Sequence, residues 1–293
     1  MILKKIFLIF TLLVLVTFKS YSQSLVKPDY GRGVSEAING NYISAIDLFS
    51  YAINIDSNNS MAYNNRGLCY LLIGKSSLAL IDFNKAIKLD SQNPFFFSNR
   101  ATLYAKLNQF NKAYADDSIS INLNKSIGLF YYNRAICQSS MSIPNYHEII
   151  DDLTKSISLK TIYSDHNVKV VNDNKTLFFY EYNLAYAYYN RGFINAILGL
   201  NINAINDYKK SIELKPSADA YYNLAHVYVQ ESKFEMAIEE LTNSIKINPN
   251  YSEAYGYRGM VFELFDLDKA CEDWRTAAKL GSEVAVEFLK NCK

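Results

Sequence analysis

Apolar residues recur along most of this chain with the period of an amphipathic helix, in pairs of segments separated by short polar turns. The stretch from Ala220 to Pro249 contains one such pair, and the proline ends it. Its small and apolar positions keep a spacing of three or four residues within each half: Tyr221, Ala225, Tyr228, Ala237, Leu241 and Ser244. This pattern predicts two helices that pack against each other as a hairpin.

The same pattern returns about every 34 residues. The repeats begin at Val26, Ser60, Pro94, Gly128, Ala185, Ala218 and Ser252. The eighth position is always small: Gly33, Gly67, Ala101, Ala135, Gly192, Ala225 and Gly259. A large residue fills position 24 in most repeats, although Asp117 interrupts this column: Phe49, Phe83, Leu153, Tyr208, Leu241 and Trp274. Small residues let the two helices of a hairpin approach closely, so the columns predict a stack of similar hairpins.

The order of these positions resembles the tetratricopeptide repeat, in which an aromatic residue, a Gly or Ala and a Tyr precede an Ala, a large apolar residue and a Pro. The resemblance covers roughly Val26 to Leu280. It implies an all-α chain, a right-handed α-solenoid of about seven helix hairpins closed by a C-terminal capping helix.

The first 22 residues depart from the repeat pattern. Lys4 and Lys5 precede an apolar run from Ile6 to Phe18, and Ser20-Tyr21-Ser22 supplies small residues for cleavage. We expect a signal peptide over 1–22, and hence an exported protein of the periplasm, the cell envelope or the medium. An uncleaved anchor is the alternative, but the run is shorter than the roughly 20 residues that span a bilayer, so no stable membrane span is expected after cleavage.

Four segments follow the leader. Residues 26–160 carry repeats 1–4, 161–184 an insertion and the start of an extended helix, 185–281 repeats 5–7, and 282–293 the cap helix. Thr161 to Lys175 is polar around a short Val168–Val171 run, which predicts a loop. We expect a helix to begin near Asn174 or Thr176 and to continue through Asn190.

The cysteines form two pairs with different expectations. Cys271 lies ten residues before Gly281 and Cys292 lies eleven after it, so an antiparallel hairpin brings them to the same height. An exported protein meets oxidising conditions, and we expect a disulfide here. Cys69 and Cys137 both occupy position 10, two repeats apart, where buried thiols serve as small apolar residues.

Composition and motifs argue against chemistry and nucleic-acid binding. The formal net charge is +1, and removal of the three leader lysines leaves −2, which provides no electrostatic attraction for nucleic acid. His147-Glu-Ile-Ile-Asp151 lacks the second histidine of a zinc-protease helix, and the chain has no glycine-rich phosphate loop. We expect no catalytic site, no metal and no cofactor.

Opposite charges recur at two positions of the repeats. Position 7 carries Arg32, Arg66, Arg100, Arg134, Arg191 and Arg258, whereas position 23 carries Asp82, Asp116, Asp152, Asp207, Glu240 and Asp273. Leu224 replaces the arginine in the repeat of Glu240. We expect an ion pair within each hairpin, and an anion-binding row of arginines is the alternative.

Asparagine recurs at position 6, which faces the concave groove in proteins of the resembled family: Asn65, Asn99, Asn133, Asn190 and Asn223. An amide can both donate to and accept from a peptide group, so these residues could hold an extended peptide by its backbone. They could equally bond to one another within the array. Both interpretations remain open at this point.

An aromatic stripe marks the same predicted groove. Tyr182, Tyr186, Tyr189 and Phe193 follow one another at helical spacing, and Tyr132 and Tyr222 flank them. Aromatic side chains anchor many protein interfaces. The alternative is that the insertion at Thr161–Lys175 folds back over the stripe.

These observations predict a non-catalytic scaffold that holds a protein or peptide segment in the concave groove. An assembly factor of the cell envelope that acts through convex or end surfaces is a second interpretation, and an accessory subunit of an envelope enzyme a third.

Overall fold

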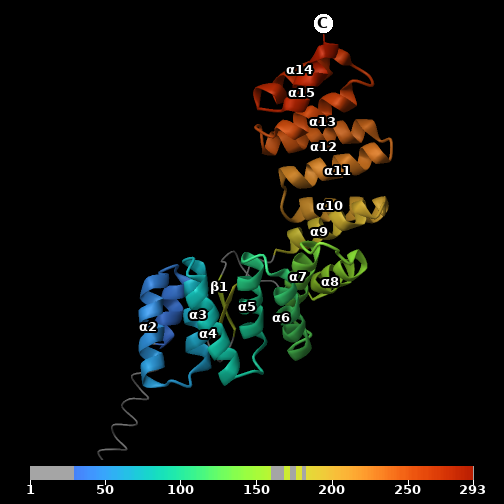
Figure 1. Cartoon of the computed structure of the whole chain (residues 1–293). Coiled ribbons are helices and arrows are strands. Elements are labelled where there is room, and N and C mark those ends of the chain that lie inside the picture. The colour runs from blue at the N-terminus through green and yellow to red at the C-terminus, as the bar shows by residue number, and fades with distance from the viewer. Residues whose placement is uncertain (1–29, 160–167, 172–175, 180–182, 293) are drawn as a thin grey trace, which may run out of the picture. The chain divides into compact units, whose positions relative to one another are not determined.

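A computed structural model describes residues 30–159, 168–171, 176–179 and 183–292 (Figure 1). The leader and Tyr182 lie outside these ranges. The chain divides into two compact units, and its described residues fall into 30–144, 168–171 and 176–179 in the first unit and 145–159 and 183–292 in the second.

The first unit is a series of helix hairpins with a small β-hairpin. Residues 30–38 are helical and precede α2 (Tyr42–Ile55), α3 (Ser60–Leu72), α4 (Ser76–Leu89), α5 (Pro94–Lys106), α6 (Phe110–Leu123) and α7 (Gly128–Ser139). Each helix packs on the next one, with α3 on α4 and α5 on α6 as the tightest pairs. Strands β1 (Val168–Val171) and β2 (Thr176–Phe179) belong to the same unit.

The second unit continues the series. It contains α8 (Tyr146–Ser158), α9 (Leu184–Ile197), α10 (Asn201–Leu214), α11 (Ala218–Gln230), α12 (Phe234–Ile247), α13 (Ser252–Phe262), α14 (Leu267–Lys279) and α15 (Glu283–Phe288), and a 3-10 turn at Leu289–Asn291. Here α9 pairs with α10, α11 with α12 and α13 with α14. The predicted α-solenoid is therefore confirmed, with α15 packed on α14 at its end.

The turn between the two helices of a hairpin depends on the backbone conformation of one residue, at position 15 of the repeat. Gly40, Gly74 and Gly199 occupy position 15 with φ between 69 and 84°, a left-handed conformation that closes the first helix of the hairpin at little cost for glycine. Asn108 and Ser232 adopt the same conformation at the same position. These five hairpin turns are thus alike although the residue changes.

The core of each hairpin lies between positions 8 and 24. Phe49, Phe83 and Trp274 are fully buried there, and Tyr208 is 1 % exposed. A Cβ atom built on Gly259 would lie 2.5 Å from Nε1 of Trp274, so only glycine leaves room for that indole. The small residues at position 8 and the large residues at position 24 are therefore repeated in the sequence because they pack against each other.

Asp117 replaces the large residue of this column in the third hairpin. It is fully buried, and the thiol of Cys137 on α7 lies 3.9 Å from its Oδ2. The hairpin of α5 and α6 forms nevertheless, because Ala101 and Ala113 still pack closely.

The insertion differs from the prediction. Thr176–Phe179 is a strand, not the start of a helix, and it pairs antiparallel with Val168–Val171, which was expected to lie in a loop. Both runs are rich in β-branched and aromatic residues, which favour strands. Helix α9 begins only at Leu184, where the side chain of Asn183 caps it by accepting from the backbone NH of Ala185 at 2.8 Å.

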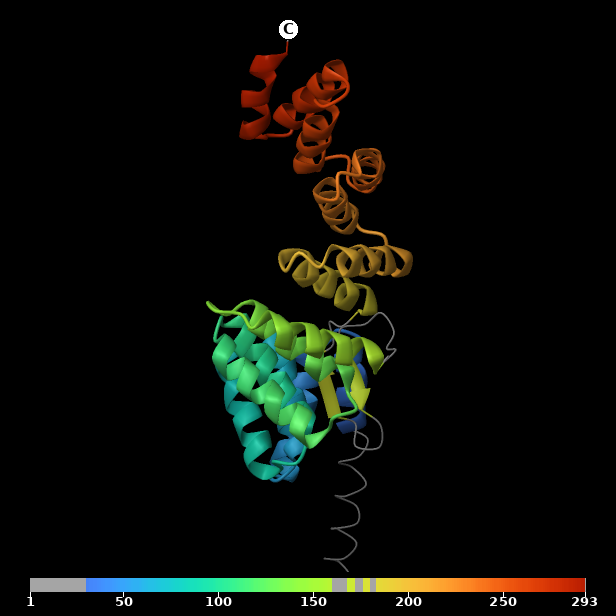
Figure 2. The same ribbon diagram turned by 90° about the vertical axis from the view of Figure 1, so that its right-hand side faces the viewer.

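Strand β2 lies against α3 and α5 of the first unit, as both views show (Figures 1 and 2). These two are the first helices of consecutive hairpins. The insertion therefore returns to helices that precede it by about 70 to 110 residues, although the repeats themselves contact mainly their neighbours.

The cysteines are placed in two ways. Cys271 and Cys292 form a disulfide with a Cα–Cα distance of 5.8 Å, which ties the end of the chain to α14. Cys69 and Cys137 are buried free thiols. Burial raises the pKa of the Cys69 thiol to about 12, and burial together with Asp117 raises the pKa of Cys137.

We expect thiol counting to reproduce this pairing. Alkylation of the protein in denaturant without reductant should label Cys69 and Cys137 alone, because the other two sulfurs are bonded to each other. Prior reduction should raise the number of labelled cysteines to four, and should lower the free energy of unfolding by about 3 kcal/mol for a loop of this size. Peptide mapping of the labels is the measurement. Four labelled cysteines without reductant would contradict the disulfide.

Candidate functional site

The asparagines at position 6 bond within the array. The Nδ2 atom of each donates to the residue at position 5 of the preceding hairpin: Asn65 to Tyr30 Oη at 2.9 Å, Asn99 to Asn64 Oδ1 at 2.9 Å, Asn133 to Ser98 Oγ at 3.4 Å and Asn223 to Tyr189 Oη at 2.8 Å. Asn190 is half-buried on α9. Within each unit, these bonds join the first helices of successive hairpins along one face.

That face is closed in the first unit. Asn64 and Asn65 are fully buried and Asn99 is 1 % exposed, and β2 lies against the helices that carry them. Asn65 and Asn99 are therefore not open to a partner, in contrast to the prediction of an accessible groove. The physical reason is that their amides are engaged by neighbours and the chain's own strand covers the helices. Tyr132, on α7 of the same unit, is half-buried.

The corresponding face of the second unit is exposed. On α9, Tyr186 is 43 % exposed, Phe193 45 % and Ile197 48 %, and Met260 on α13 is 43 % exposed. Tyr189 lies between them, with its ring centroid 5.8 Å from that of Tyr208 in the core. The predicted stripe is thus open over its described part. The described strands of the insertion pack on α3 and α5 within the first unit.

A cluster of four rings continues the exposed face across α11 and α13. The ring of Tyr222 lies 4.7 Å from His226, 5.2 Å from Tyr251 and 5.9 Å from Tyr257. His226 stacks on Tyr257 at 3.9 Å with an interplanar angle of 13°. We call the side of α9, α11 and α13 that carries these residues the aromatic face: Tyr186, Tyr189, Phe193, Tyr222, His226, Tyr251, Tyr257 and Met260.

The ring side chains of the aromatic face carry no charge at physiological pH. Burial lowers the pKa of His226, so its imidazole is uncharged near pH 7. Burial and the neighbouring Tyr222 raise the pKa of Tyr257 to about 12. Burial and a hydrogen bond to Asp219 raise the pKa of Tyr251. The face therefore presents phenol groups and an imidazole that can form hydrogen bonds beside apolar ring surface.

Sequence reasoning missed four members of this face: His226, Tyr251, Tyr257 and Met260. A signal was present for Tyr257, which occupies position 6 where asparagine stands in five other repeats. The loss of asparagine there coincides with the ring that stacks on His226. A departure from the repeat thus marks the exposed surface better than the repeat itself.

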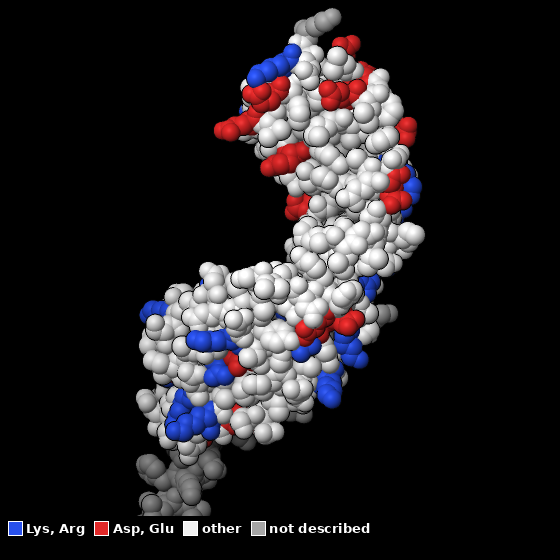
Figure 3. Space-filling model, turned by 45° about the vertical axis from the view of Figure 1, so that its right-hand side comes forward, with Lys and Arg blue, Asp and Glu red and all other residues white. Residues whose placement is uncertain are grey.

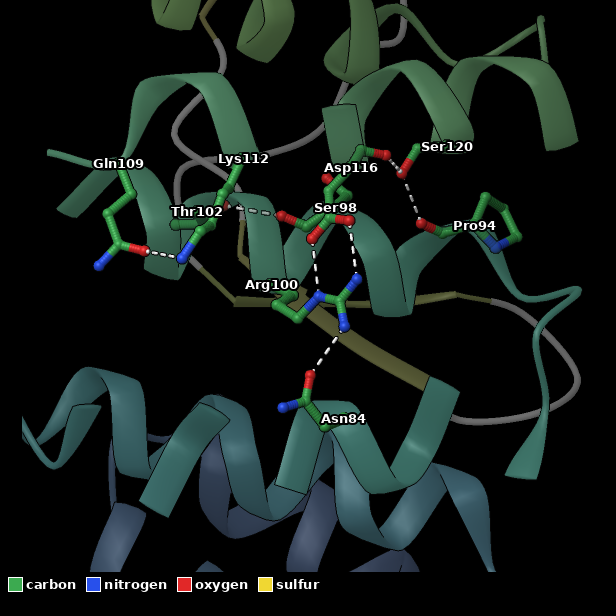
Figure 4. Close-up of polar contacts among 9 residues, drawn as sticks. All are labelled: Asn84, Pro94, Ser98, Arg100, Thr102, Gln109, Lys112, Asp116 and Ser120. Atoms are coloured by element: carbon green, nitrogen blue, oxygen red, sulfur yellow. Dashed lines mark hydrogen bonds and ion pairs between the residues drawn. The ribbon is translucent and has the colours of Figure 1, made fainter. Parts of the chain in front are cut away.

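Four arginines of position 7 form ion pairs with the aspartates of position 23 inside their hairpins, as expected. Nε and Nη2 of Arg100 donate to the two carboxylate oxygens of Asp116 at 2.7 and 2.8 Å, and Nη1 donates to Asn84 of the preceding hairpin at 2.7 Å (Figure 4). The same two-oxygen contact joins Arg66 to Asp82, Arg191 to Asp207 and Arg258 to Asp273. These guanidinium groups hold neighbouring hairpins together.

In the sixth repeat, the acid at position 23 has a different counter-charge. Leu224 is buried at the arginine position, and burial raises the pKa of Glu240 at the acidic position. The positive charge comes from Lys209 of the preceding hairpin, which acts to lower that pKa, and Asn243 donates to Glu240 at 3.4 Å. A cation therefore faces the acid here too, but from the other hairpin.

Within the described residues, no group of three or more His, Cys, Asp or Glu side chains is arranged to hold a metal ion. His147 and His226 lie on different helices, α8 and α11. A search of the same residues for a long apolar helix that could cross a bilayer found none.

Comparison with known proteins agrees with this architecture. Models of the tetratricopeptide repeat match residues 60–93, 185–217 and 218–251. The C-terminal part of a TPR repeat-containing protein from Cytophaga hutchinsonii superposes with a TM-score of 0.62 at 18% identity, over 92% of this chain and 98% of that one. PilF of Pseudomonas aeruginosa gives a TM-score of 0.62 at 15% identity, over 80% and 98%.

A third similar structure is that of YrrB, described as a TPR protein with an unusual peptide-binding site. It superposes with a TM-score of 0.57 at 16% identity, over 71% of this chain and 97% of that one. At these identities the similarity establishes the fold.

The buried hydrogen bonds of the first unit predict a stability effect that distinguishes two asparagines at the same repeat position. Asn99→Ala removes the donor to Asn64 inside a covered face and should cost about 1–2 kcal/mol. Asn223→Ala is the matched control, since its partner Tyr189 is half-buried and water can replace the lost donor. Urea unfolding followed by circular dichroism is the measurement. Equal midpoints for the two variants would contradict the assignment.

Proposed function

Because this chain is a tetratricopeptide repeat protein, a class of protein-interaction scaffold, we propose that it holds an extended segment of another protein on the aromatic face. The observation that carries the proposal is the surface of α9, α11 and α13, where exposed apolar side chains flank half-buried rings. Tyr186, Phe193 and Met260 are each more than 40 % exposed there, beside the ring cluster of Tyr222. Exposed aromatic groups that gather on one surface are typical of binding sites.

The spacing of the helices favours an extended segment. First helices of successive hairpins lie about 10 Å apart, and an extended chain advances about 3.3 Å per residue. Roughly every third residue of such a segment would meet a new helix, so three helices suit a segment of about seven to nine residues. The phenol groups of Tyr222 and Tyr257 can each donate to or accept from a peptide group.

The first unit is not proposed as the binding site. There β2 packs on α3 and α5, and the asparagines Asn65 and Asn99 on these helices are buried. The peptide-binding site named for YrrB supports the proposal by analogy of fold only.

We place this scaffold outside the cytoplasm. The bonded pair Cys271–Cys292 supports that compartment, because disulfides persist in oxidising surroundings. The expected leader predicts that the native protein starts at Gln23, which mass spectrometry of its N-terminal peptide can measure. A native protein that starts at Met1 would contradict cleavage.

Site-specific photo-cross-linking tests the binding surface. A benzophenone side chain at Phe193 or Met260 of the full mature chain should cross-link to a segment of another protein in extracts of the producing cells. The two positions should give peptides from the same short segment, because both lie on one face. Mass spectrometry of the cross-linked peptides is the measurement.

The matched control carries the same group at Ile202, which is 75 % exposed at the start of α10 in the same unit. It should not yield that segment. If Ile202 captures the same segment as efficiently as Phe193, or if the two positions on the aromatic face capture unrelated peptides, the proposed surface is wrong.

A further inference from the structure

We infer that the segment held on the aromatic face is cationic and contributes Lys or Arg side chains to it. The inference rests on the proposed function and specifies the chemistry of the partner. Three observations support it. Two carboxylates border the ring cluster, the arginines on the same helices are already ion-paired, and the described part of the second unit has more acidic than basic side chains.

Two carboxylates border the ring cluster. Asp219 and Glu253 stand at position 2 of α11 and α13, and both are exposed. The charge of Asp219 helps to raise the pKa of Tyr189 and Tyr251, and that of Glu253 helps to raise the pKa of Tyr222. Both carboxylates are therefore close enough to the rings to act on a group bound there.

The arginines of these helices are already engaged. Arg191 on α9 is paired with Asp207, and Arg258 on α13 with Asp273. Helix α11 contains no Lys or Arg. Over the described part of the chain, the structure shows no ion pair to Asp219 or Glu253. A cation supplied by a partner would therefore meet two carboxylates that no described ion pair engages.

The rings provide a second attraction for the same kind of partner. A Lys or Arg placed over a tyrosine ring gains from the negative face of that ring. The molecule already contains such a contact on this face, where Nζ of Lys215 lies 5.3 Å from the ring centroid of Tyr186. A planar guanidinium could stack on Tyr222 or Tyr257 while bonding to a carboxylate.

The surrounding charge acts in the same direction. The described residues of the second unit hold 18 Asp and Glu against 12 Lys and Arg, whereas those of the first unit hold 7 against 11. In Figure 3, acidic side chains gather on the second unit and basic ones on the first. An acidic surface raises the encounter rate of cationic segments and disfavours acidic ones.

Asp219 and Glu253 also lie in the first turns of their helices, where a negative charge stabilises the helix end. With this structural role alone, neutralising Asp219 and Glu253 would slightly lower the thermal stability of the protein. It would not change which peptides the protein prefers. The test therefore has to read ligand preference as well as stability.

Selection from a random peptide library displayed on phage, with the full mature chain as bait, provides that test. Peptides should be retained only if they fail to bind the Phe193→Ser/Met260→Ser variant, which removes exposed apolar groups from the aromatic face. We expect the retained peptides to be enriched in Lys and Arg. The affinity of the most enriched peptide, measured by fluorescence anisotropy, should fall about tenfold in Asp219→Asn/Glu253→Gln.

The control is Glu235→Gln/Glu239→Gln, which changes the formal charge equally at two exposed positions on α12. This control should bind the most enriched peptide with an affinity within about twofold of that of the unchanged chain. High salt should weaken its preference for Lys and Arg only because salt screens the attraction between charges. If the control loses as much affinity as the test variant, net charge and not the two named carboxylates makes the preference, and the inference is overturned.

The two levels of the argument can fail separately. Retained peptides without enrichment in Lys and Arg would overturn the cationic partner and leave the aromatic face as a binding surface. A selection that yields no peptide dependent on Phe193 and Met260 would overturn the proposed function, and the inference with it.

Discussion

The close approach of the two helices in each hairpin is the constraint on which the rest of this structure depends. A small residue at position 8 faces a large one at position 24, and at Gly259 even a Cβ atom would collide with the indole of Trp274. This contact fixes how far apart the helices lie, and so it places Arg258 where it can reach both carboxylate oxygens of Asp273. The guanidinium then reaches Thr242 of the preceding hairpin at 2.9 Å. Packing inside a hairpin thus sets the geometry between hairpins.

The fold was predictable from the sequence because the repeats are local. Columns such as position 8 and position 24 report contacts between residues about 16 apart, and a 34-residue ruler detects them. The pairing of Cys271 with Cys292 follows from the same local geometry. The insertion has no counterpart in the other repeats. No repeated position could therefore indicate that Thr176–Phe179 is a strand or that it lies on α3 and α5. Burial of Asn65 and Asn99 depends on that distant contact and could not be foreseen.

The two units use equivalent helix faces in opposite ways. In the first, asparagines at position 6 close a buried polar array beneath β2. In the second, position 6 of α13 is Tyr257, whose half-buried ring stacks on His226. The candidate site was partly predictable from the stripe on α9, but its extension to His226 required knowledge of which rings meet.

The return of β2 to α3 and α5 has a consequence for how the chain is made. Most repeat proteins can complete each part as it leaves the ribosome, because every repeat needs only its neighbours. Here the first helices of the first unit wait for a strand that is synthesised about 100 residues later. At 5–20 residues per second this delay is on the order of 5–20 s. During that interval the nascent chain exposes an uncovered polar face, and a truncation before residue 176 would leave it open permanently.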